Sequence, residues 1–452
     1  MRIVLVSSGS VARQFAEELS REDDVVVVHS GEEGLSELEK LDVELLEGEG
    51  NDVSVLKRAG VEEADYLIAC TRSDEMNLLA CLMGRQLGKA RTICFVGKEE
   101  YIKTFGAQDG SVIGEAPRLG IDHLVWPARM LADKIEKVLA VPGATDVGRF
   151  AQGRISLLEY RLRDGSPFID KPIMEVRALP PGVLMAAVTR GEEWFVPRGQ
   201  SVLAEGDRVL FIGRSEAMHQ LAAWFTETLG EEATGDLVII GGGTVGLRLA
   251  QSLERNPKAR IKIIEHDEER CAAIAHALER ALVLHGDGCD LDLLEAERVR
   301  YARALVAVTD SDEKNLLASL LGRHLGIPKV ITRVTNSANR RVFERVGIDV
   351  PLSTRGAATE AVLHLIRHRD VDLLATIGEG QGEVLELTVP ERFTPKPMHE
   401  LAMPQDSIVA SIVRKGDAMV PGGATLVGPG DHCIVICKVE RVEEVLKVFL
   451  QP

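Results

Sequence analysis

The chain contains an internal duplication, and this feature limits its possible folds more than any other. The segment Thr71–Ala80 (TRSDEMNLLA) recurs as Thr309–Ala318 (TDSDEKNLLA). The similarity continues into the later part of each half, where Pro197–Asp207 corresponds to Pro421–Asp431. A chain of 452 residues with this pattern is expected to fold as repeated domains and not around one large core.

The first part of each half alternates short apolar runs with helical patterns. In the second half, the runs Leu237–Ile240 and Ile261–Ile264 flank a helical pattern that starts near Gly246. This order predicts an α/β fold with a Rossmann-like, doubly wound parallel sheet in each half. The later part of each half has short strand patterns, turn signals such as Asp164-Gly165 and Gly430-Asp431, and one closing helix, which predicts a small α+β domain.

We therefore predict four domains in the order Rossmann-like, small, Rossmann-like, small. The Rossmann-like domains are expected at residues 1–140 and 234–370, and the small domains at residues 147–228 and 372–452. Two helical segments follow the sheets and precede the joints between domains, at Pro127–Leu139 and Ala357–His368. Their position makes them candidates for parts that move when a ligand binds.

Composition and charge exclude several classes of protein. Lys and Arg number 53 against 70 Asp and Glu, and the net charge of −17 argues against a broad nucleic-acid or anionic-lipid surface. No apolar run approaches the roughly 18 to 20 residues of a membrane span. The apolar run Ile3–Val6 is too short for a signal-peptide core, and the seven cysteines show no CxxC spacing, so we expect a reduced, cytosolic location.

The strongest local motif is Gly241-Gly242-Gly243-Thr244-Val245-Gly246, between an apolar strand pattern and a helix. In this context Gly241 permits a tight turn, Gly243 lets the backbone approach a pyrophosphate, and Gly246 permits close packing of helix and strand. Glu265 ends the next strand pattern, where a carboxylate can accept hydrogen bonds from ribose hydroxyls. The motif predicts a nucleotide site, and the alternative is a glycine-rich turn that serves packing only.

The first half departs from this motif at several positions. It has Ser7 for the first glycine, Ala12 for the third, His29 for the strand-end acid and Phe95 for Arg333. Only Gly9 keeps its place. We therefore predict that the second half is the better nucleotide binder; the alternative is a first site that has drifted and still binds through its backbone.

A second group of polar residues stands where a strand pattern opens into a helix. Its members are Thr309, Asp312 and Asn315, with Thr71, Asp74 and Asn77 in the first half. Either Thr or Asp caps the helix, or the group contacts a ligand at the carboxyl ends of the strands. Asp287, after Gly286 at another strand end, has the same two interpretations.

Three other groups are weaker candidates. His364 and His368 lack the glutamate of a zinc-binding HExxH helix, and we expect a solvated or packed pair. Cys433 and Cys437 lie on one face of a strand pattern and are expected in the core. Cys289 and His285 lack a third orienting group for thiol chemistry. We expect no catalytic residues and no metal site.

The order of these motifs resembles the RCK (KTN) family, and in particular the peripheral subunits of Trk-type bacterial potassium uptake systems, which carry two RCK units in one chain. The resemblance covers the chain from Met1 to about Leu450. It implies a cytoplasmic gating ring, a homo-oligomer of tetrameric form, on the inner face of the membrane. The implied partner is a membrane-embedded potassium-translocating subunit of the TrkH or TrkG kind. The implied ligands are NAD(H) and ATP or ADP, with no nucleic acid.

The resemblance also implies which residues surround the nucleotide. In the second half these are Gly241, Gly243, Thr244, Gly246, Glu265, Asp287, Thr309 and Arg333. In the first half only Gly9, Ser10 and Thr71 match well. Two other functions share the glycine motif: an NAD-dependent oxidoreductase, and a free-standing nucleotide sensor that acts on other partners.

Overall fold

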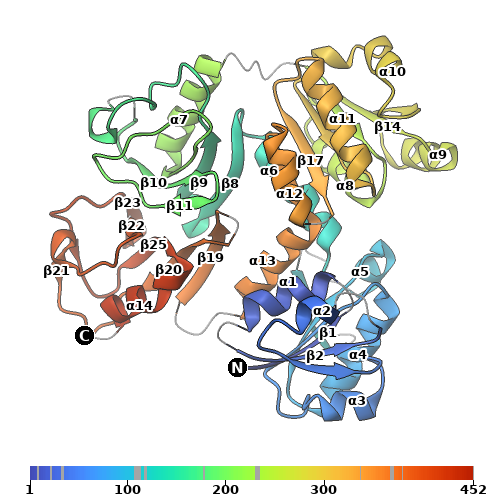
Figure 1. Ribbon diagram of the computed structural model, residues 1–452, viewed down its shortest axis with the longest axis horizontal. Helices are drawn as coiled ribbons and strands as arrows, with labels where there is room; N and C mark the ends of the chain where they lie inside the picture. Colours follow the sequence, from blue (N-terminus) through green and yellow to red (C-terminus); the bar gives the residue numbers. More distant parts are fainter. Residues whose placement is uncertain are drawn as a thin grey trace. The chain divides into compact units, whose positions relative to one another are not determined.

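The computed structural model describes residues 1–7, 10–20, 23–31, 35–105, 113–116, 120–176, 179–229, 235–335, 337–366, 371–378 and 380–450. The chain divides into two compact units, Met1–Asp133 with Leu352–Val362, and Lys134–Pro351 with Leu363–Pro452. Two helices, α6 (Pro127–Leu139) and α13 (Thr354–Ile366), contribute residues to both units (Figure 1).

The first unit contains a seven-stranded sheet in the order β3-β2-β1-β4-β5-β7-β6. All neighbouring strands are parallel except β6, which is antiparallel to β7. The central strands are buried along most of their length, as expected of a parallel sheet that is covered on both faces. The elements are β1 Arg2–Ser7, α1 Ser10–Leu19, β2 Asp24–His29, α2 Leu35–Leu38, β3 Glu44–Glu47, α3 Val53–Arg58, β4 Tyr66–Cys70, α4 Asp74–Leu87, β5 Arg91–Phe95, α5 Glu99–Phe105, β6 Ile113–Ala116 and β7 Ile121–Val125.

A six-stranded sheet in the second unit has the corresponding order β15-β14-β13-β16-β17-β18. Val238 and Ile240 of its central strand pack with Leu305 in a buried core. The elements are β13 Leu237–Ile240, α8 Thr244–Leu253, β14 Ile261–Glu265, α9 Glu268–Ala277, β15 Leu282–His285, α10 Leu291–Ala296, β16 Ala304–Ala307, α11 Asp312–His324, β17 Val330–Val334, α12 Ser337–Arg345 and β18 Val350–Ser353. Helix α8 begins at Thr244, slightly before the Gly246 expected from the sequence.

Two antiparallel five-stranded sheets form the small domains, in the orders β11-β10-β12-β9-β8 and β19-β20-β25-β22-β23. The first is built from β8 Ala144–Phe150, β9 Ile155–Arg161, β10 Val183–Arg190, β11 Glu193–Phe195, β12 Arg208–Arg214 and helix α7 Ser215–Leu229. The second is built from β19 Val371–Ile377, β20 Gly382–Thr388, β22 Ser407–Arg414, β23 Asp417–Met419, β25 His432–Lys438 and helix α14 Val442–Leu450. A short ladder of β21 Lys396–Pro397 and β24 Leu426–Val427 lies beside it.

The repeated Gly-Asp turn of the small domains ends in a buried carboxylate. Asp431 is 2% exposed and accepts hydrogen bonds from Arg414 through Nε and Nη2, both at 2.7 Å. Burial raises the pKa of Asp431, but the Arg414 guanidinium outweighs it and holds the pKa below its usual value. Asp207 and Arg190 make the same pair in the first half. The repeated motif therefore ties the turn to a neighbouring strand.

Within the second unit, the two small sheets share one apolar core. Trp194 of the first sheet is 1% exposed and belongs to the same buried cluster as Ile434 and Ile436 of the second. The backbone of Gly382 packs closely on the indole ring, because a Cβ atom there would lie 2.7 Å from ring atoms Cε2 and Cζ2. The two small domains are thus joined by apolar packing inside one chain.

The predicted fold class is confirmed: each half has a doubly wound parallel sheet followed by a small α+β domain. The helix predicted at Pro127–Leu139 is α6. The helix predicted at Ala357–His368 is α13, which starts at Thr354, and His368 lies outside the described residues. The domain boundaries stay predictions.

The shared core leads to a stability prediction. Trp194→Ala removes the indole ring, and we expect it to lower the free energy of unfolding of the second unit by about 3–5 kcal/mol. Met174→Ala is the control, because Met174 is 65% exposed and its loss should change stability by less than about 0.5 kcal/mol. Urea-induced unfolding followed by far-UV circular dichroism measures both. Equal midpoints for the two variants would contradict the shared core.

Candidate nucleotide-binding site

The glycine turn of the second half joins β13 to α8 and has the geometry that its sequence requires. Gly241 has a φ of +102°, and a Cβ atom there would lie 3.0 Å from Thr309 Cγ2. A Cβ atom at Gly246 would overlap the carbonyl oxygen of Gly241. Both positions therefore need glycine, the first for conformation and the second for close packing of helix against strand.

Gly243 has a different role, because its backbone is extended and any residue could adopt that conformation. It is the N-cap residue of α8, and no side chain accepts a hydrogen bond from the first turn of that helix. A Cβ atom at Gly243 would meet no described protein atom within 4 Å. The first N–H groups of α8 have no partner within the helix, and together with the helix dipole they form a suitable cradle for a phosphate.

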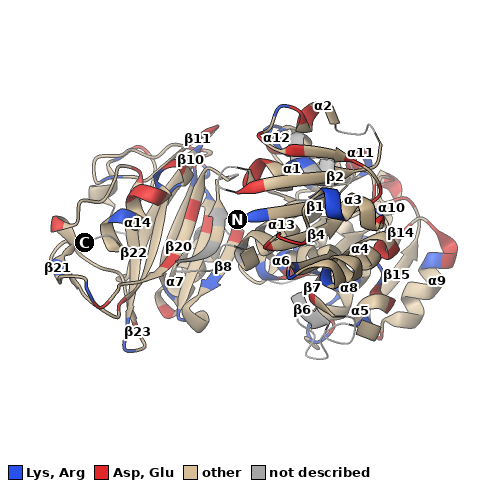
Figure 2. Ribbon diagram, turned by 90° about the horizontal axis from the view of Figure 1, so that it is seen from below, with Lys and Arg blue, Asp and Glu red and all other residues tan. Residues whose placement is uncertain are grey.

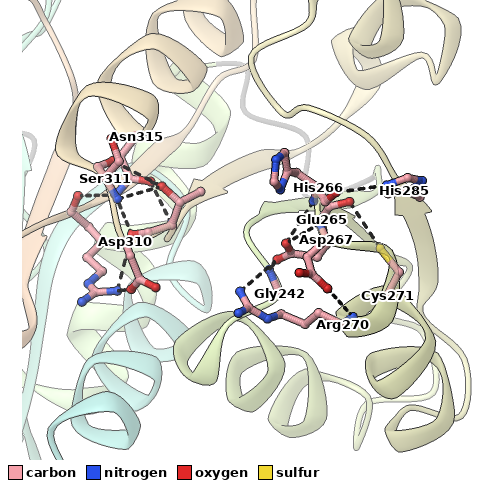
Figure 3. Close-up of polar contacts among 12 residues, drawn as sticks. Gly242, Glu265, His266, Asp267, Arg270, Cys271, His285, Asp310, Ser311 and Asn315 are labelled. Carbon is pink, nitrogen blue, oxygen red and sulfur yellow. Dashed lines mark hydrogen bonds and ion pairs between the residues drawn. The ribbon is translucent and has the colours of Figure 1, made fainter.

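Glu265 ends β14 and is 7% exposed. Its Oε2 accepts a hydrogen bond from Gly242 N at 2.7 Å, and its Oε1 accepts two from His266 N and Asp267 N, each at 3.0 Å (Figure 3). A carboxylate has about four acceptor positions, so one remains on Oε2. The side chain therefore holds the glycine turn against β14 and keeps room for one ribose hydroxyl. If both ribose hydroxyls bound to Glu265, as the sequence predicts, the carboxylate would lose one of its three hydrogen bonds from backbone N–H groups.

Arg270 of α9 lies near the same carboxylate, with Nη1 3.9 Å from Glu265 Oε2. Figure 2 shows acidic residues at the start of α9, which are Glu268 and Glu269 of its first turn. The neighbouring strand places His285 opposite Glu265, and His285 Nε2 donates to the backbone oxygen of His266 at 3.0 Å. Arg270 of α9 and His285 of β15 are therefore neighbours of Glu265.

Asn315 organises the other side of the site. It is fully buried, and its Oδ1 accepts hydrogen bonds from Thr309 N at 2.8 Å and Thr309 Oγ1 at 2.7 Å (Figure 3). Its Nδ2 donates to Thr309 O at 3.0 Å and to Arg333 O at 3.1 Å. One amide therefore joins the carboxyl ends of β16 and β17. Thr309 is committed to this network, which leaves its methyl group beside Gly241.

The expectation that Thr309 or Asp312 caps helix α11 is wrong. Ser311 is the N-cap residue and accepts from Lys314 N at 3.1 Å, while Asp312 accepts from Thr335 N at 2.7 Å and so ties the helix start to the end of β17. In the first half Ser73 caps α4. The serine was missed although serine followed by Asp-Glu is a good helix-start signal.

Arg333 lies at the carboxyl end of β17 and its side chain is 19% exposed. Nη1 donates to Asp310 Oδ1 at 2.7 Å and to Thr309 O at 3.4 Å. Its Nε is buried and has no hydrogen-bond partner within the described part of the chain. A buried donor without a partner is costly, so this atom fits a polar ligand group. Asp287 is exposed, and its Oδ1 accepts from Cys289 N at 2.9 Å as a turn residue.

The corresponding region of the first half has the same scaffold with different side chains. Asn77 makes the same bonds to Thr71 and to Phe95 O. Phe95 itself is buried and packs edge-on against Phe15, with ring centroids 5.6 Å apart. Ser7 is buried and receives a hydrogen bond from the Cys70 thiol at 3.2 Å. At the position of Arg333, the first half therefore has the apolar contact between Phe95 and Phe15 in place of a charged side chain.

Other predicted site residues of the first half can be placed only in part. Gly9 lies outside the described residues, and so do the side chains of Ser10 and Ala12. His29 ends β2, and its Nδ1 donates to Gly31 O at 3.2 Å. The ligand contacts predicted for this half stay predictions.

The cysteines near the second site are poor nucleophiles. Burial raises the pKa of both Cys271 and Cys289, so neither thiol ionises readily. Cys433 and Cys437 are core residues, as predicted, and burial raises their pKa to about 12. His368 and the side chain of His364 lie outside the described residues. In the described part of the chain, no three His, Cys, Asp or Glu side chains are grouped so as to hold a metal ion.

None of the described helices combines the length and the apolar character that a membrane crossing requires.

Comparison with known proteins finds family models for both Rossmann-like sheets and for the first small domain. The TrkA-N domain model matches residues 3–114 and 237–354, and the TrkA-C domain model matches residues 157–226. The chain is similar to two archaeal Trk system potassium uptake protein TrkA homologs, homolog 1 of Methanosarcina mazei and that of Archaeoglobus fulgidus. Each is 33% identical over 99% of this chain and 100% of the relative. TrkA of Halomonas elongata is 30% identical over 99% of this chain and 98% of its own.

Solved structures show the same fold at lower identity. The crystal structure of the GsuK RCK domain matches with a TM-score of 0.60 and 19% identity, over 100% of this chain and 96% of that one. The GsuK channel bound to NAD matches with a TM-score of 0.60 and 20% identity, over 100% of this chain and 80% of the other. The family models cover more than half of the sequence and the relatives match nearly all of it, so the chain belongs to the TrkA family of Trk-system potassium uptake proteins.

Proposed function

We propose that this chain is a nucleotide-sensing regulatory subunit of a potassium uptake system and is not an enzyme. The observation that carries the proposal is the first turn of α8. It has no side-chain cap, no side chain at Gly243, and Glu265 on one side and Arg333 on the other. Membership of the TrkA family supports potassium uptake as the process that is regulated.

The second half is proposed to bind NAD(H), and ATP or ADP as alternative ligands. These nucleotides share an adenosine half and a run of phosphates. The α8 terminus, at Gly243 and Thr244, would hold the phosphates, Glu265 would accept one ribose hydroxyl, and Arg333 Nε would reach the part of the ligand that lies across β16 and β17. Asp287 and Thr309 would lie beside the nucleotide without forming an ion pair with it.

A ligand can regulate a partner only if it binds one conformation better than another. Moving an equilibrium from 1:99 to 99:1 needs about 5.5 kcal/mol of differential affinity. A homo-oligomeric ring of four chains would add smaller contributions from several sites, about 1–3 kcal/mol each. Helices α6 and α13 each contribute to both compact units, which supports their role as the moving parts. The proposed partner is a TrkH- or TrkG-like potassium-translocating subunit at the inner face of the membrane.

The competing hypothesis of an NAD-dependent oxidoreductase shares the glycine turn. An oxidoreductase has to turn over NADH with a substrate, whereas a sensor only binds it. Incubation with NADH and a panel of carbonyl compounds separates the two, and steady oxidation of NADH would reject the sensor. A sensor that acts on other partners would fail to associate with membranes that contain the potassium-translocating subunit.

Glu265 provides a test of where the nucleotide binds. Glu265→Ala removes the ribose acceptor and releases Gly242 N, and we expect NADH binding to weaken by about 1–3 kcal/mol in isothermal titration calorimetry. His29→Ala is the matched control, because His29 occupies the same strand end in the first half. Its effect on the tighter NADH site should be negligible. Weakening by His29→Ala alone would place that site in the first half.

Gly243 and Gly246 separate ligand binding from folding. Gly243→Asp places a good N-cap residue at an open position, so the melting temperature should stay the same or rise, while its charge should weaken nucleotide binding by at least about 2 kcal/mol. Gly246→Ala adds a methyl group that overlaps Gly241 O, and we expect it to lower stability by about 1–3 kcal/mol. Differential scanning fluorimetry with and without NADH measures both. Normal NADH binding by Gly243→Asp would rule out the α8 terminus as the phosphate site.

A further inference from the structure

Polar contacts of Ser252 and of Lys329 attach helix α6 to the second Rossmann-like domain, and both lie inside the second compact unit. The first contact joins α6 to α8. Ser252 Oγ, in the last turn of α8, donates to Glu136 Oε2 of α6 at 2.5 Å. Helix α8 therefore has the proposed phosphate cradle at its first turn and α6 at its last. At 1.5 Å per residue these two ends are roughly 12 Å apart.

The second contact is a lysine ammonium buried at the end of α6. Lys329 is 7% exposed, and its Nζ donates to Val138 O at 2.5 Å and to Val141 O at 2.8 Å. Val138 lies in the last turn of α6 and Val141 just beyond it. The last carbonyls of a helix lack partners within the helix and carry its negative dipole end, so a cation there stabilises the helix end.

Lys329 lies at the start of the strand that carries Arg333. It immediately precedes β17, the strand whose carboxyl end carries Arg333. Strand residues rise about 3.3 Å each, so Lys329 and Arg333 are separated by roughly 13 Å along one stiff strand. The nucleotide site and α6 are therefore connected twice, along α8 and along β17.

We propose that Lys329 is the positioning residue that couples nucleotide binding at the second site to helix α6. This inference rests on the proposed function. A ligand held by the α8 terminus and by Arg333 biases the relative position of α8 and β17, and the far ends of both elements hold the last turns of α6. Lys329 fixes the end of that helix, so displacement of α8 or β17 is transmitted to α6 and is not lost by fraying of its last turn.

The first half provides a matched comparison. Arg91 immediately opens β5, as Lys329 precedes β17, and it is exposed. Arg91→Met therefore removes a cation from the same place in the repeated fold without touching the end of α6. It is the control for Lys329→Met, which keeps the side-chain length and removes the charge and the donors.

The experiment measures amide hydrogen exchange of residues 134–144 in the full chain, with and without saturating NADH, beside NADH titration calorimetry. Without ligand, we expect Lys329→Met to speed exchange in this segment by roughly 5- to 30-fold, because the helix end loses its cap. With NADH, exchange in this segment should change in the wild type and in Arg91→Met, and this change should be absent in Lys329→Met. Lys329→Arg, which keeps a cation, should restore part of it.

NADH affinity distinguishes coupling from damage to the site. Lys329→Met should still bind NADH, with an affinity changed by no more than about tenfold, since only the coupling is lost. If NADH changes the amide exchange of residues 134–144 equally in the wild type and in Lys329→Met, the inference about Lys329 is wrong. The proposed function is not affected by that result. Absence of NADH binding to the wild type overturns the proposed function as well. If Lys329→Met does not fold, Ser252→Ala decides, because an undiminished change in that variant rejects the connection through α8.

Discussion

The close contact between Gly246 and the carbonyl oxygen of Gly241 is the constraint on which the second half depends. It lets α8 begin close to the end of β13, and no side chain caps the first N–H groups of the helix. A side chain at Gly246 would move the helix away from the strand, and one at Gly241 would press on Thr309. Glu265 then fixes the turn from the neighbouring strand by accepting from Gly242 N. The open helix end is thus a consequence of backbone packing, and its ability to hold an anion follows from it.

Comparison of the duplicated halves separates the contacts that both copies keep from the side chains that differ between them. Asn77 and Asn315 make the same bonds to two strand ends, because an unpaired backbone group at a buried edge is costly in either half. The side chains at the ends of β5 and β17 differ. Phe95 packs into an aromatic contact, whereas Arg333 keeps a buried donor unpaired. The scaffold tolerates this difference because Asn77 and Asn315 join the strand ends in both halves, whichever side chain stands at the position of Phe95 and Arg333.

The second unit also shows what duplication within one chain provides. The two small sheets bury Trp194 between them, which a single copy could do only with a second chain. Ser252 and Lys329 tie α6 to α8 and to the start of β17, the elements that carry the proposed nucleotide site. A helix that follows the first sheet is therefore positioned by the domain of the other half. If the second half binds a nucleotide as proposed, binding there would affect the connection that leaves the first half.

Much of the fold and part of the site followed from the sequence, for reasons that are local. Apolar runs such as Leu237–Ile240, the glycines and the repeated segments determine strands, turns and domain order, because each depends on spacing along the chain. Helix α6 was predicted at its observed bounds on the same ground. The roles of Ser311 and Asp312 were not, since the capping residue depends on which of two adjacent side chains turns toward the helix. Only the tertiary structure decided that Glu265 spends three of its acceptor positions on backbone groups and that Lys329 reaches the end of α6. The bonds of Glu265 to Gly242 and of Lys329 to Val138 and Val141 join residues far apart in sequence, and no local pattern encodes the direction in which such a side chain points.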